Sequence, residues 1–279
     1  MPADEPVTDP DRGVAADLLS AEELDRYSWQ AEVADLGRTG QRRLKEATVL
    51  VSRIGGVGGT AALYLAAAGV GRLVLAHAGP IRRNDLNRQI LMATPAIGRP
   101  RIEVAAERLA AVNPHVVVET VAENVSEANA GGLVAGCSVA VGAAPLFAER
   151  LALNAAAMRA GIPLVDAAMF DMEVRLFTVM PGGRPCLACL CPEPPPQWQR
   201  KFPVLGAISG VAGSLAAAEA VRIIAGEAAA GAGRLFVLDG TTLASRLIAI
   251  PPRSDCRVCG TSRETPAGGV DGDAARSVR

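Results

Sequence analysis

The chain has 279 residues, of which half are hydrophobic and only 3% are aromatic, and its formal net charge is −1. A charge this close to zero gives no reason to expect nucleic acid or an anionic membrane as a partner. We recognise no signal peptide, and charged residues interrupt the alanine-rich runs well short of a membrane span, so we expect a cytoplasmic protein.

The order of the predicted elements indicates an α/β fold. Strands are expected at residues 47–52, 72–76, 115–121, 138–141 and 163–167, and helices between them at 60–68, 101–112 and 147–160. This alternation predicts a doubly wound, mostly parallel, Rossmann-like sheet with helices on both faces. The pattern then changes to strands at 174–180, 235–238 and 244–250 and a long alanine-rich helix at 207–226, which predicts a C-terminal antiparallel extension.

The two ends of the chain differ in composition from the rest. Residues 1–20 and 261–279 are rich in polar residues and have little apolar surface to bury, so we expect both segments to be disordered. The folded domain is expected to span residues 21–260.

A glycine-rich turn follows the first predicted strand and contains Gly55, Gly56 and Gly58. Glycines at this place let the backbone approach a phosphate at the N-terminus of the next helix. A dinucleotide site also needs an acid at the end of the second strand, and that strand ends at His77 instead, so a nicotinamide-dependent oxidoreductase is the least favoured function. His77 is interpreted either as a residue that contacts a ligand or as a solvated histidine at a strand end.

Four of the six cysteines form two pairs with C-x-x-C spacing, Cys186 with Cys189 and Cys256 with Cys259. Two such pairs can supply the four thiolates of a closed, structural zinc site that ties the C-terminal extension to the middle of the fold. Disulfides are the alternative, which we disfavour because nothing in the sequence is typical of a secreted protein.

Further motifs follow one another in the order of a known family. They are Arg26–Gln30 (RYSWQ), Gly55–Gly58 (GGVG), Tyr64–Gly71, Asp85–Gln89 (DLNRQ), Gly98–Arg101 (GRPR) and Val112–His115 (VNPH). With the two cysteine pairs, they resemble the ThiF/MoeB/HesA family, the bacterial relatives of ubiquitin-activating enzymes.

The resemblance implies an adenylyltransferase that uses ATP and magnesium to activate the C-terminal carboxylate of a ubiquitin-like sulfur carrier protein or of a peptide. It also implies a homodimer, or a heterodimer with an active homologue. The implied catalytic residues are Arg88 and Arg101, and the implied nucleotide-binding residues are Gly55, Gly56, Gly58, Asn87, Arg88, Gln89 and Arg101.

Four positions depart from the family's pattern. Arg53 stands at the first glycine of the turn, where a side chain is expected to crowd the chain. His77 replaces the acid that holds the ribose, and Trp29 replaces an arginine that reaches the ATP of the other subunit. Pro145 stands where the family carries a magnesium-binding aspartate. These replacements predict weak ATP binding that magnesium improves little.

Two functions therefore remain open. One is an adenylyltransferase whose ATP site is rebuilt with arginines at 53, 82, 83, 88 and 101. The other is a catalytically impaired member that acts as a carrier-, peptide- or partner-binding subunit. The segment 197–203 also lacks the cysteine with which many members accept the activated acyl group. Cys191 is interpreted as a spare thiol or an alternate metal ligand, and Cys137 as a small buried apolar residue.

Overall fold

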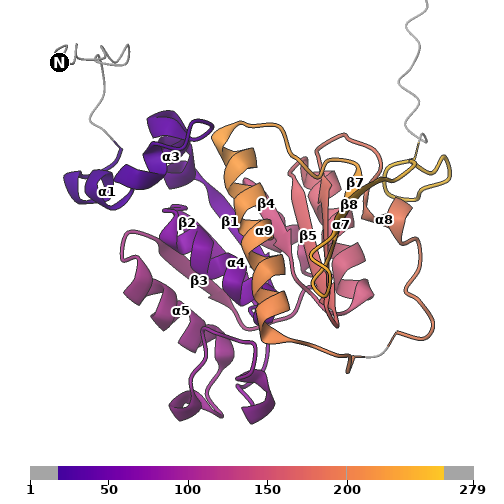
Figure 1. The fold of residues 1–279 in the computed structure, drawn as a ribbon, viewed down its shortest axis with the longest axis horizontal. Helices are drawn as coiled ribbons and strands as arrows, with labels where there is room; N and C mark the ends of the chain where they lie inside the picture. Colours follow the sequence, from indigo (N-terminus) through magenta and orange to yellow (C-terminus); the bar gives the residue numbers. More distant parts are fainter. Residues whose placement is uncertain (1–17, 199, 261–279) are drawn as a thin grey trace, which may run out of the picture.

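The computed structural model describes residues 18–198 and 200–260 and contains one sheet of eight strands (Figure 1). The strands are β1 (Thr48–Ser52), β2 (Arg72–Ala76), β3 (Val117–Val121), β4 (Val139–Gly142), β5 (Leu164–Phe170), β6 (Glu173–Val179), β7 (Arg234–Asp239) and β8 (Ser245–Ala249). Their spatial order is β3-β2-β1-β4-β5-β6-β7-β8, in which β1 to β5 pair in parallel and β5 to β8 pair antiparallel. The predicted parallel sheet with an antiparallel extension is confirmed.

The four predicted helices are present, whereas a ten-residue helix at Gly37–Glu46 and several shorter helices were not predicted. The α-helices are α1 (Ala21–Arg26), α2 (Ser28–Ala31), α3 (Gly37–Glu46), α4 (Gly56–Ala67), α5 (Arg101–Val112), α6 (Ala130–Val134), α7 (Phe147–Ala160), α8 (Leu187–Leu190) and α9 (Gly206–Ala225). The prediction placed the start of α4 at residue 60, but the helix begins within the glycine turn itself. Two 3-10 turns, η1 (Arg83–Asp85) and η2 (Thr94–Ala96), lie between β2 and α5.

The segments expected to be disordered lie largely outside the described residues, which exclude 1–17 and 261–279. Of residues 18–20, Leu19 is buried, and Ser20 caps α1 by accepting from the backbone N–H of Glu23.

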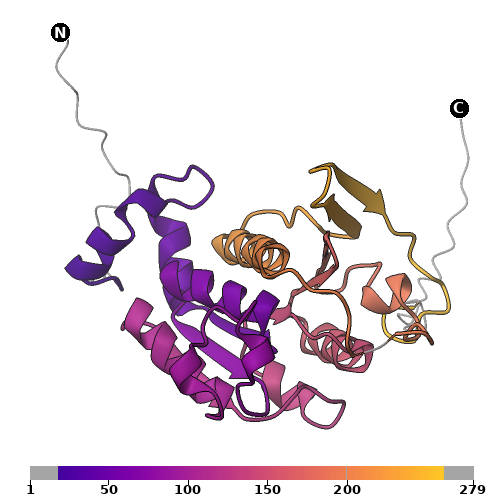
Figure 2. The same cartoon turned by 60° about the horizontal axis from the view of Figure 1, so that its bottom comes forward.

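The parallel strands are buried on both faces. In β1, Val49 and Val51 belong to one apolar cluster, while Leu50 belongs to the cluster on the opposite face, as expected for side chains that alternate along a strand. Helices α3, α4, α5 and α9 cover the first face, and α6, α7 and α8 cover the second. Figures 1 and 2 both show α9 lying beside α4 across the middle of the sheet.

Helix α9 is, among the described helices, the one with the length and apolarity that a membrane span requires, with a mean hydropathy of 1.5. It packs against α4, β5 and β6, and the central helix of a globular core passes the same test.

Candidate functional site

A cavity of about 730 Å³ opens at the carboxyl ends of the parallel strands. Its wall comes from the segments that follow β1, β2 and β4, from β5, and from the segment that leads into the start of α9. Strand β1 lies between β2 and β4, so the cavity stands where the strand order reverses. Open α/β sheets bind their ligands at this point, because the loops on either side diverge and leave a crevice.

The glycine turn forms one side of the cavity, and its glycines have different roles. A Cβ on Gly58 would lie 2.2 Å from the carbonyl oxygen of Arg53, and a Cβ on Gly56 would lie 2.9 Å from the Cβ of Ser209 on α9. A Cβ on Gly55 would meet only the Nε2 atom of Gln89, at 3.9 Å, so this glycine borders open space. Because no side chain caps α4, the N–H groups of its first turn are available to an anion.

Arg53 adopts a glycine-like backbone conformation, with φ 65°. Its side chain does not crowd the turn as predicted, but points to Glu149 on α7. Nε of Arg53 donates to one carboxylate oxygen of Glu149 at 2.7 Å and Nη2 donates to the other at 2.5 Å. Both side chains are about nine-tenths buried, so this bidentate pair is part of the structure that supports the cavity floor.

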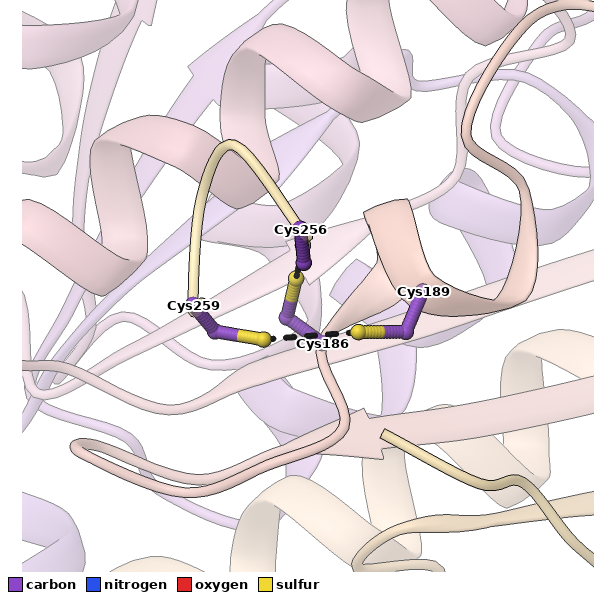
Figure 3. A group of neighbouring side chains, drawn as sticks. All are labelled: Cys186, Cys189, Cys256 and Cys259. Carbon is purple, nitrogen blue, oxygen red and sulfur yellow. Dashed lines mark hydrogen bonds between the residues drawn. The ribbon is translucent and has the colours of Figure 1, made fainter. Parts of the chain in front are cut away.

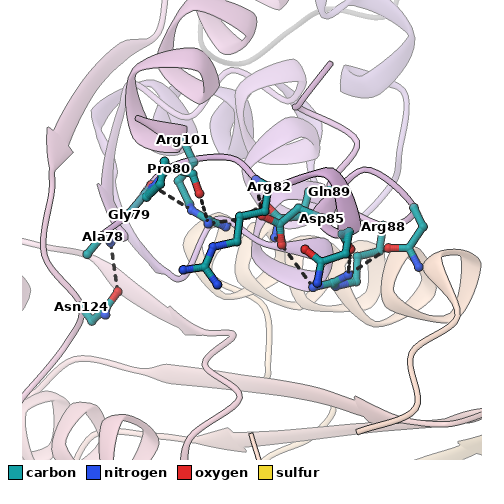
Figure 4. Close-up of polar contacts among 11 residues, drawn as sticks. Ala78, Gly79, Pro80, Arg82, Asp85, Arg88, Gln89, Arg101 and Asn124 are labelled. Atoms are coloured by element: carbon teal, nitrogen blue, oxygen red, sulfur yellow. Dashed lines mark hydrogen bonds and ion pairs between the residues drawn. The ribbon is translucent and has the colours of Figure 1, made fainter. Parts of the chain in front are cut away.

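Asp85, which the sequence analysis did not single out, is the centre of the predicted nucleotide-binding residues (Figure 4). Its Oδ1 accepts from Gln89 at 2.9 Å and from Arg88 at 3.3 Å. Its Oδ2 accepts from the backbone N–H of Arg82 at 2.9 Å and from Arg101 at 3.3 Å. The structure therefore brings three of the residues implied by the motifs, Arg88, Gln89 and Arg101, together around one carboxylate.

Arg88 and Arg101 are held by the protein itself. Arg101 donates through Nε to the carbonyl oxygen of Gly79, and through its two Nη atoms to Gln89 and to the carbonyl oxygen of Pro80. Burial lowers the pKa of Arg101, and Asp85 opposes that shift. Arg88 donates to Asp85 and to two asparagines, Asn84 and Asn87. The hydrogen bonds that both arginines donate hold the loops of the cavity in place. Both guanidinium groups also contribute positive charge to the cavity.

Arg82 and Arg83 differ although they are neighbours in the sequence. Arg82 lines the cavity and forms no ion pair with any described residue, and Figure 4 shows its guanidinium extending away from Asp85. Arg83 does not line the cavity. Of the two further arginines that the sequence analysis named, the structure thus places one at the site.

His77 is buried, with 5% of its surface exposed, so the interpretation as a solvated strand-end histidine is wrong. It lines the cavity, and its Nδ1 atom is buried without a partner among the described residues. Its pKa is lowered to about 2, mainly by burial and to a lesser extent by the nearby positive charges of Arg101 and Arg53. The imidazole is therefore neutral at physiological pH and offers a polar atom to a ligand.

The cavity is strongly cationic. Its lining holds seven cationic side chains, which are Arg53, Arg82, Arg88, Arg101, Arg150, Arg200 and Lys201. The carboxylates that pair with them are Asp85, Glu149 and Asp166, which leaves an excess of four positive charges.

Among the described residues, the cavity wall offers no carboxylate that is free for magnesium. Asp85 already accepts four hydrogen bonds, and Pro145 lines the wall where the family's pattern has an aspartate. Magnesium requires oxygen ligands in octahedral geometry. The positively charged guanidinium groups around the cavity also repel a magnesium ion. The residues present do not fit a protein-held magnesium ion. Trp29 lies outside the cavity and is 91% exposed.

A second candidate site is formed by the four paired cysteines, whose sulfur atoms all lie within 4.8 Å of one another (Figure 3). The Sγ atoms of Cys186 and Cys256 are 3.7 Å apart, and those of Cys189 and Cys259 are 3.4 Å apart. Four thiolates at about 2.3 Å from a tetrahedral zinc ion are separated by about 3.8 Å. The predicted ligand set is therefore assembled, with a geometry that fits zinc.

Polar groups around the cysteines would support such an ion. Asn154, fully buried on α7, donates to the sulfur of Cys186 at 3.6 Å and accepts from the backbone N–H of Leu187 at 3.1 Å. Burial raises the pKa of the Cys186 and Cys259 thiols. Burial acts in the same direction on the Cys256 thiol, but backbone N–H groups outweigh it and bring the pKa to about 7. Cys191 lies outside the cluster and contacts the carbonyl oxygen of Glu193, which favours a spare thiol, and Cys137 is buried as expected.

Comparisons with known proteins agree with these features. A model of the ThiF family matches residues 27–258. The heterocyst protein HesA of Trichormus variabilis is 44% identical over 243 residues, 87% of this chain and 91% of that protein. The sulfur carrier protein ThiS adenylyltransferase of Escherichia coli is 36% identical over 245 residues, 86% and 97% of the two chains. Among solved structures, E. coli MccB with ATP superposes with a TM-score of 0.75 at 21% identity, covering 84% of this chain and 74% of that one, and shows the same fold.

Proposed function

The chain belongs to the ThiF family, and we propose that it is an adenylyltransferase that uses ATP to activate the C-terminal carboxylate of a ubiquitin-like sulfur carrier protein or of a peptide. The observation that carries this proposal is the cationic cavity at the reversal of strand order, beside the uncapped N-terminus of α4. A relative that is named for adenylation of the sulfur carrier ThiS supports the choice of substrate class.

The chemistry demands positive charge. A carboxylate oxygen forms a bond to the α-phosphorus of ATP while the bond to the bridging oxygen breaks and pyrophosphate leaves. Two anions must therefore approach each other, and negative charge develops on the leaving group. Arg82 and the first-turn N–H groups of α4 would bind the phosphates, and the fixed charges of Arg88 and Arg101 would stabilise the transition state.

His77 would contact the ribose in this arrangement. Its neutral imidazole can exchange a hydrogen bond with a hydroxyl group but cannot carry the negative charge of the acid usual at this position. Nucleotide binding would then depend more on the phosphates than on the ribose.

The cysteine cluster would hold a zinc ion with no open coordination position, so its role would be structural. It would connect α8 to the segment that follows β8, through Cys186 and Cys189 on one side and Cys256 and Cys259 on the other. We further propose that the protein acts in the cytoplasm as a homodimer, or as a heterodimer with an active homologue.

A second function, binding of a carrier, peptide or partner subunit without adenylation, is favoured by one specific observation. No carboxylate of the described cavity wall is free for magnesium, because Asp85 is occupied by four donors and Pro145 has no side-chain ligand. Weak catalysis would follow if magnesium has to be held by the protein.

Pyrophosphate–ATP exchange in the presence of candidate carrier proteins distinguishes the two functions. Adenylation predicts exchange that depends on the carrier and that Arg82→Gln lowers by about tenfold to a hundredfold, the cost of losing one charge-assisted hydrogen bond. Arg83→Gln is the matched control, since Arg83 is adjacent but does not line the cavity, and it should exchange like the native chain. Carrier binding without exchange would assign the binding function instead.

A further inference from the structure

An aromatic cluster attaches the crossing segment, which joins the end of α8 at Leu190 to the start of α9 at Gly206, to residues beside the cavity. The ring of Trp198 lies edge-on to Phe147 of α7 at 5.3 Å between centroids, and 5.2 Å from Phe202. Phe202 in turn stacks on Phe170 of β5 at 6.1 Å. The indole Nε1 of Trp198 also donates to the carbonyl oxygen of Pro145 at 2.9 Å. In a chain with only 3% aromatic residues, this cluster gives the segment a defined position.

Cationic residues that line the cavity lie between the two anchoring aromatic residues, Trp198 and Phe202. Arg200 and Lys201 stand between Trp198 and Phe202, and both line the cavity. Neither forms an ion pair with any described residue, whereas Arg53, Arg88 and Arg101 are tied to carboxylates.

The surroundings of Arg200 favour a bound anion, because this guanidinium lines the cavity beside other cationic side chains. Arg200 is an exposed residue, and its partial desolvation lowers the pKa of its guanidinium. The positive charges of Arg53 and Arg88 lower the pKa further, and the carboxylates of Glu149 and Asp85 oppose the shift. A guanidinium group near two others is repelled by them. A bound polyanion attracts all three groups and so offsets this repulsion. The Nδ1 atom of the neutral His77 imidazole, which is buried in the same cavity without a partner among the described residues, also points to a ligand there.

We propose that Arg200, supplied by the crossing segment, is a polyphosphate-binding residue that completes the site within a single chain, so that guanidinium groups replace a protein-held metal ion. The ligand class is a nucleoside triphosphate or another polyphosphate. This inference rests on the proposed function for the identity of its natural ligand, while the geometry of the crossing segment carries it independently of any reaction. The excess of four positive charges matches a metal-free triphosphate better than its magnesium complex, which carries less negative charge.

Calorimetric titration of the full chain with sodium tripolyphosphate in EDTA tests this proposal. Arg200→Gln should weaken binding by about tenfold to a hundredfold, and Arg200→Lys should restore part of the loss because it keeps the charge. Arg246→Gln, on the exposed strand β8 outside the cavity, is the control and should bind like the native chain. Excess magnesium should weaken binding to the native chain.

The role of the aromatic anchor gives a second measurement. Trp198→Ala should weaken tripolyphosphate binding about as much as Arg200→Gln, and the double variant should lose little more, because both changes remove the same contact. Native-like affinity in Arg200→Gln, or tighter binding with magnesium, would overturn the inference. Tripolyphosphate binding as expected without pyrophosphate exchange would refute the proposed function and leave this inference standing. Pyrophosphate exchange that Arg200→Gln does not affect would refute this inference and leave the proposed function standing.

Discussion

Replacing Arg53 of the buried Arg53–Glu149 pair should change the free energy of unfolding in two opposite ways, through the backbone conformation and through the loss of the ion pair. The two effects can be measured separately. Replacing Arg53 by glycine relieves a left-handed backbone conformation, φ 65°, which costs a residue with a side chain about 1–2 kcal/mol. The same change leaves the carboxylate of Glu149 unpaired, with only 9% of its side chain exposed. Loss of one partner of a buried pair costs about 3–5 kcal/mol.

Arg53→Gly should therefore lower the free energy of unfolding by about 1–4 kcal/mol, although glycine suits the backbone better. For a chain of this size, the melting temperature should fall by about 2–4 °C per kcal/mol. Adding Glu149→Gln removes the unpaired charge, so the double variant should recover to native stability or above it. Asp171→Gly is the control for the backbone term alone, because Asp171 has φ 54°, is exposed and forms no ion pair with any described residue.

Chemical denaturation of the four proteins, with the metal content held constant, measures these terms. The expected order of stability places the double variant at or above the native chain and Arg53→Gly clearly below it. If Glu149→Gln instead adds a further loss to Arg53→Gly, the carboxylate is not destabilised by the loss of its arginine, and the assignment of the pair is refuted.

Three further predictions follow from single positions. Cys256→Ser should release most of the bound zinc, since a site with three thiolates binds far more weakly, and metal analysis of the purified variant checks this; a native chain without zinc would contradict the assignment. His77 has a folded pKa of about 2, below the unfolded value of about 6.5, so its contribution to stability is complete above about pH 6.5 and falls by up to about 1.4 kcal/mol per pH unit as the pH drops below it. Denaturation between pH 7 and 4 should show a steeper acid-dependent loss in the native chain than in His77→Asn, where only the paired carboxylates still contribute to the loss; an unchanged slope in His77→Asn would refute the buried-imidazole argument. Pro145→Asp introduces a carboxylate into the cavity wall, so magnesium should tighten ATP binding to the variant by about tenfold while weakening binding to the native chain, and titrations with and without magnesium compare the two.

The sequence predicted the sheet and its main helices because their signals are local. Val49 and Val51 alternate with Leu50 between two apolar faces, and α5 and α7 occupy the predicted residues. The C-x-x-C spacing likewise fixes which cysteines can share an ion before their positions are known. The glycine turn, the motif Asp85–Gln89 and both cysteine pairs were found in the same way.

The roles of individual polar residues were decided by contacts between segments far apart in the chain. Arg53 and Glu149 are 96 positions apart, and Asn154 is 32 positions from Cys186. No periodicity links such residues, because strand order and helix packing bring them together only in the folded chain.

The sequence by itself determined the fold class, the family and the candidate metal ligands, since each rests on periodicity, spacing or motif order. Only the tertiary structure decided that His77 is buried and neutral, that Arg53 is paired, and that Arg200 lines the cavity without an ion-pair partner among the described residues. The physical reason is that the charge and protonation of a side chain depend on burial and on neighbouring groups, and both are properties of the assembled sheet rather than of any segment of the chain.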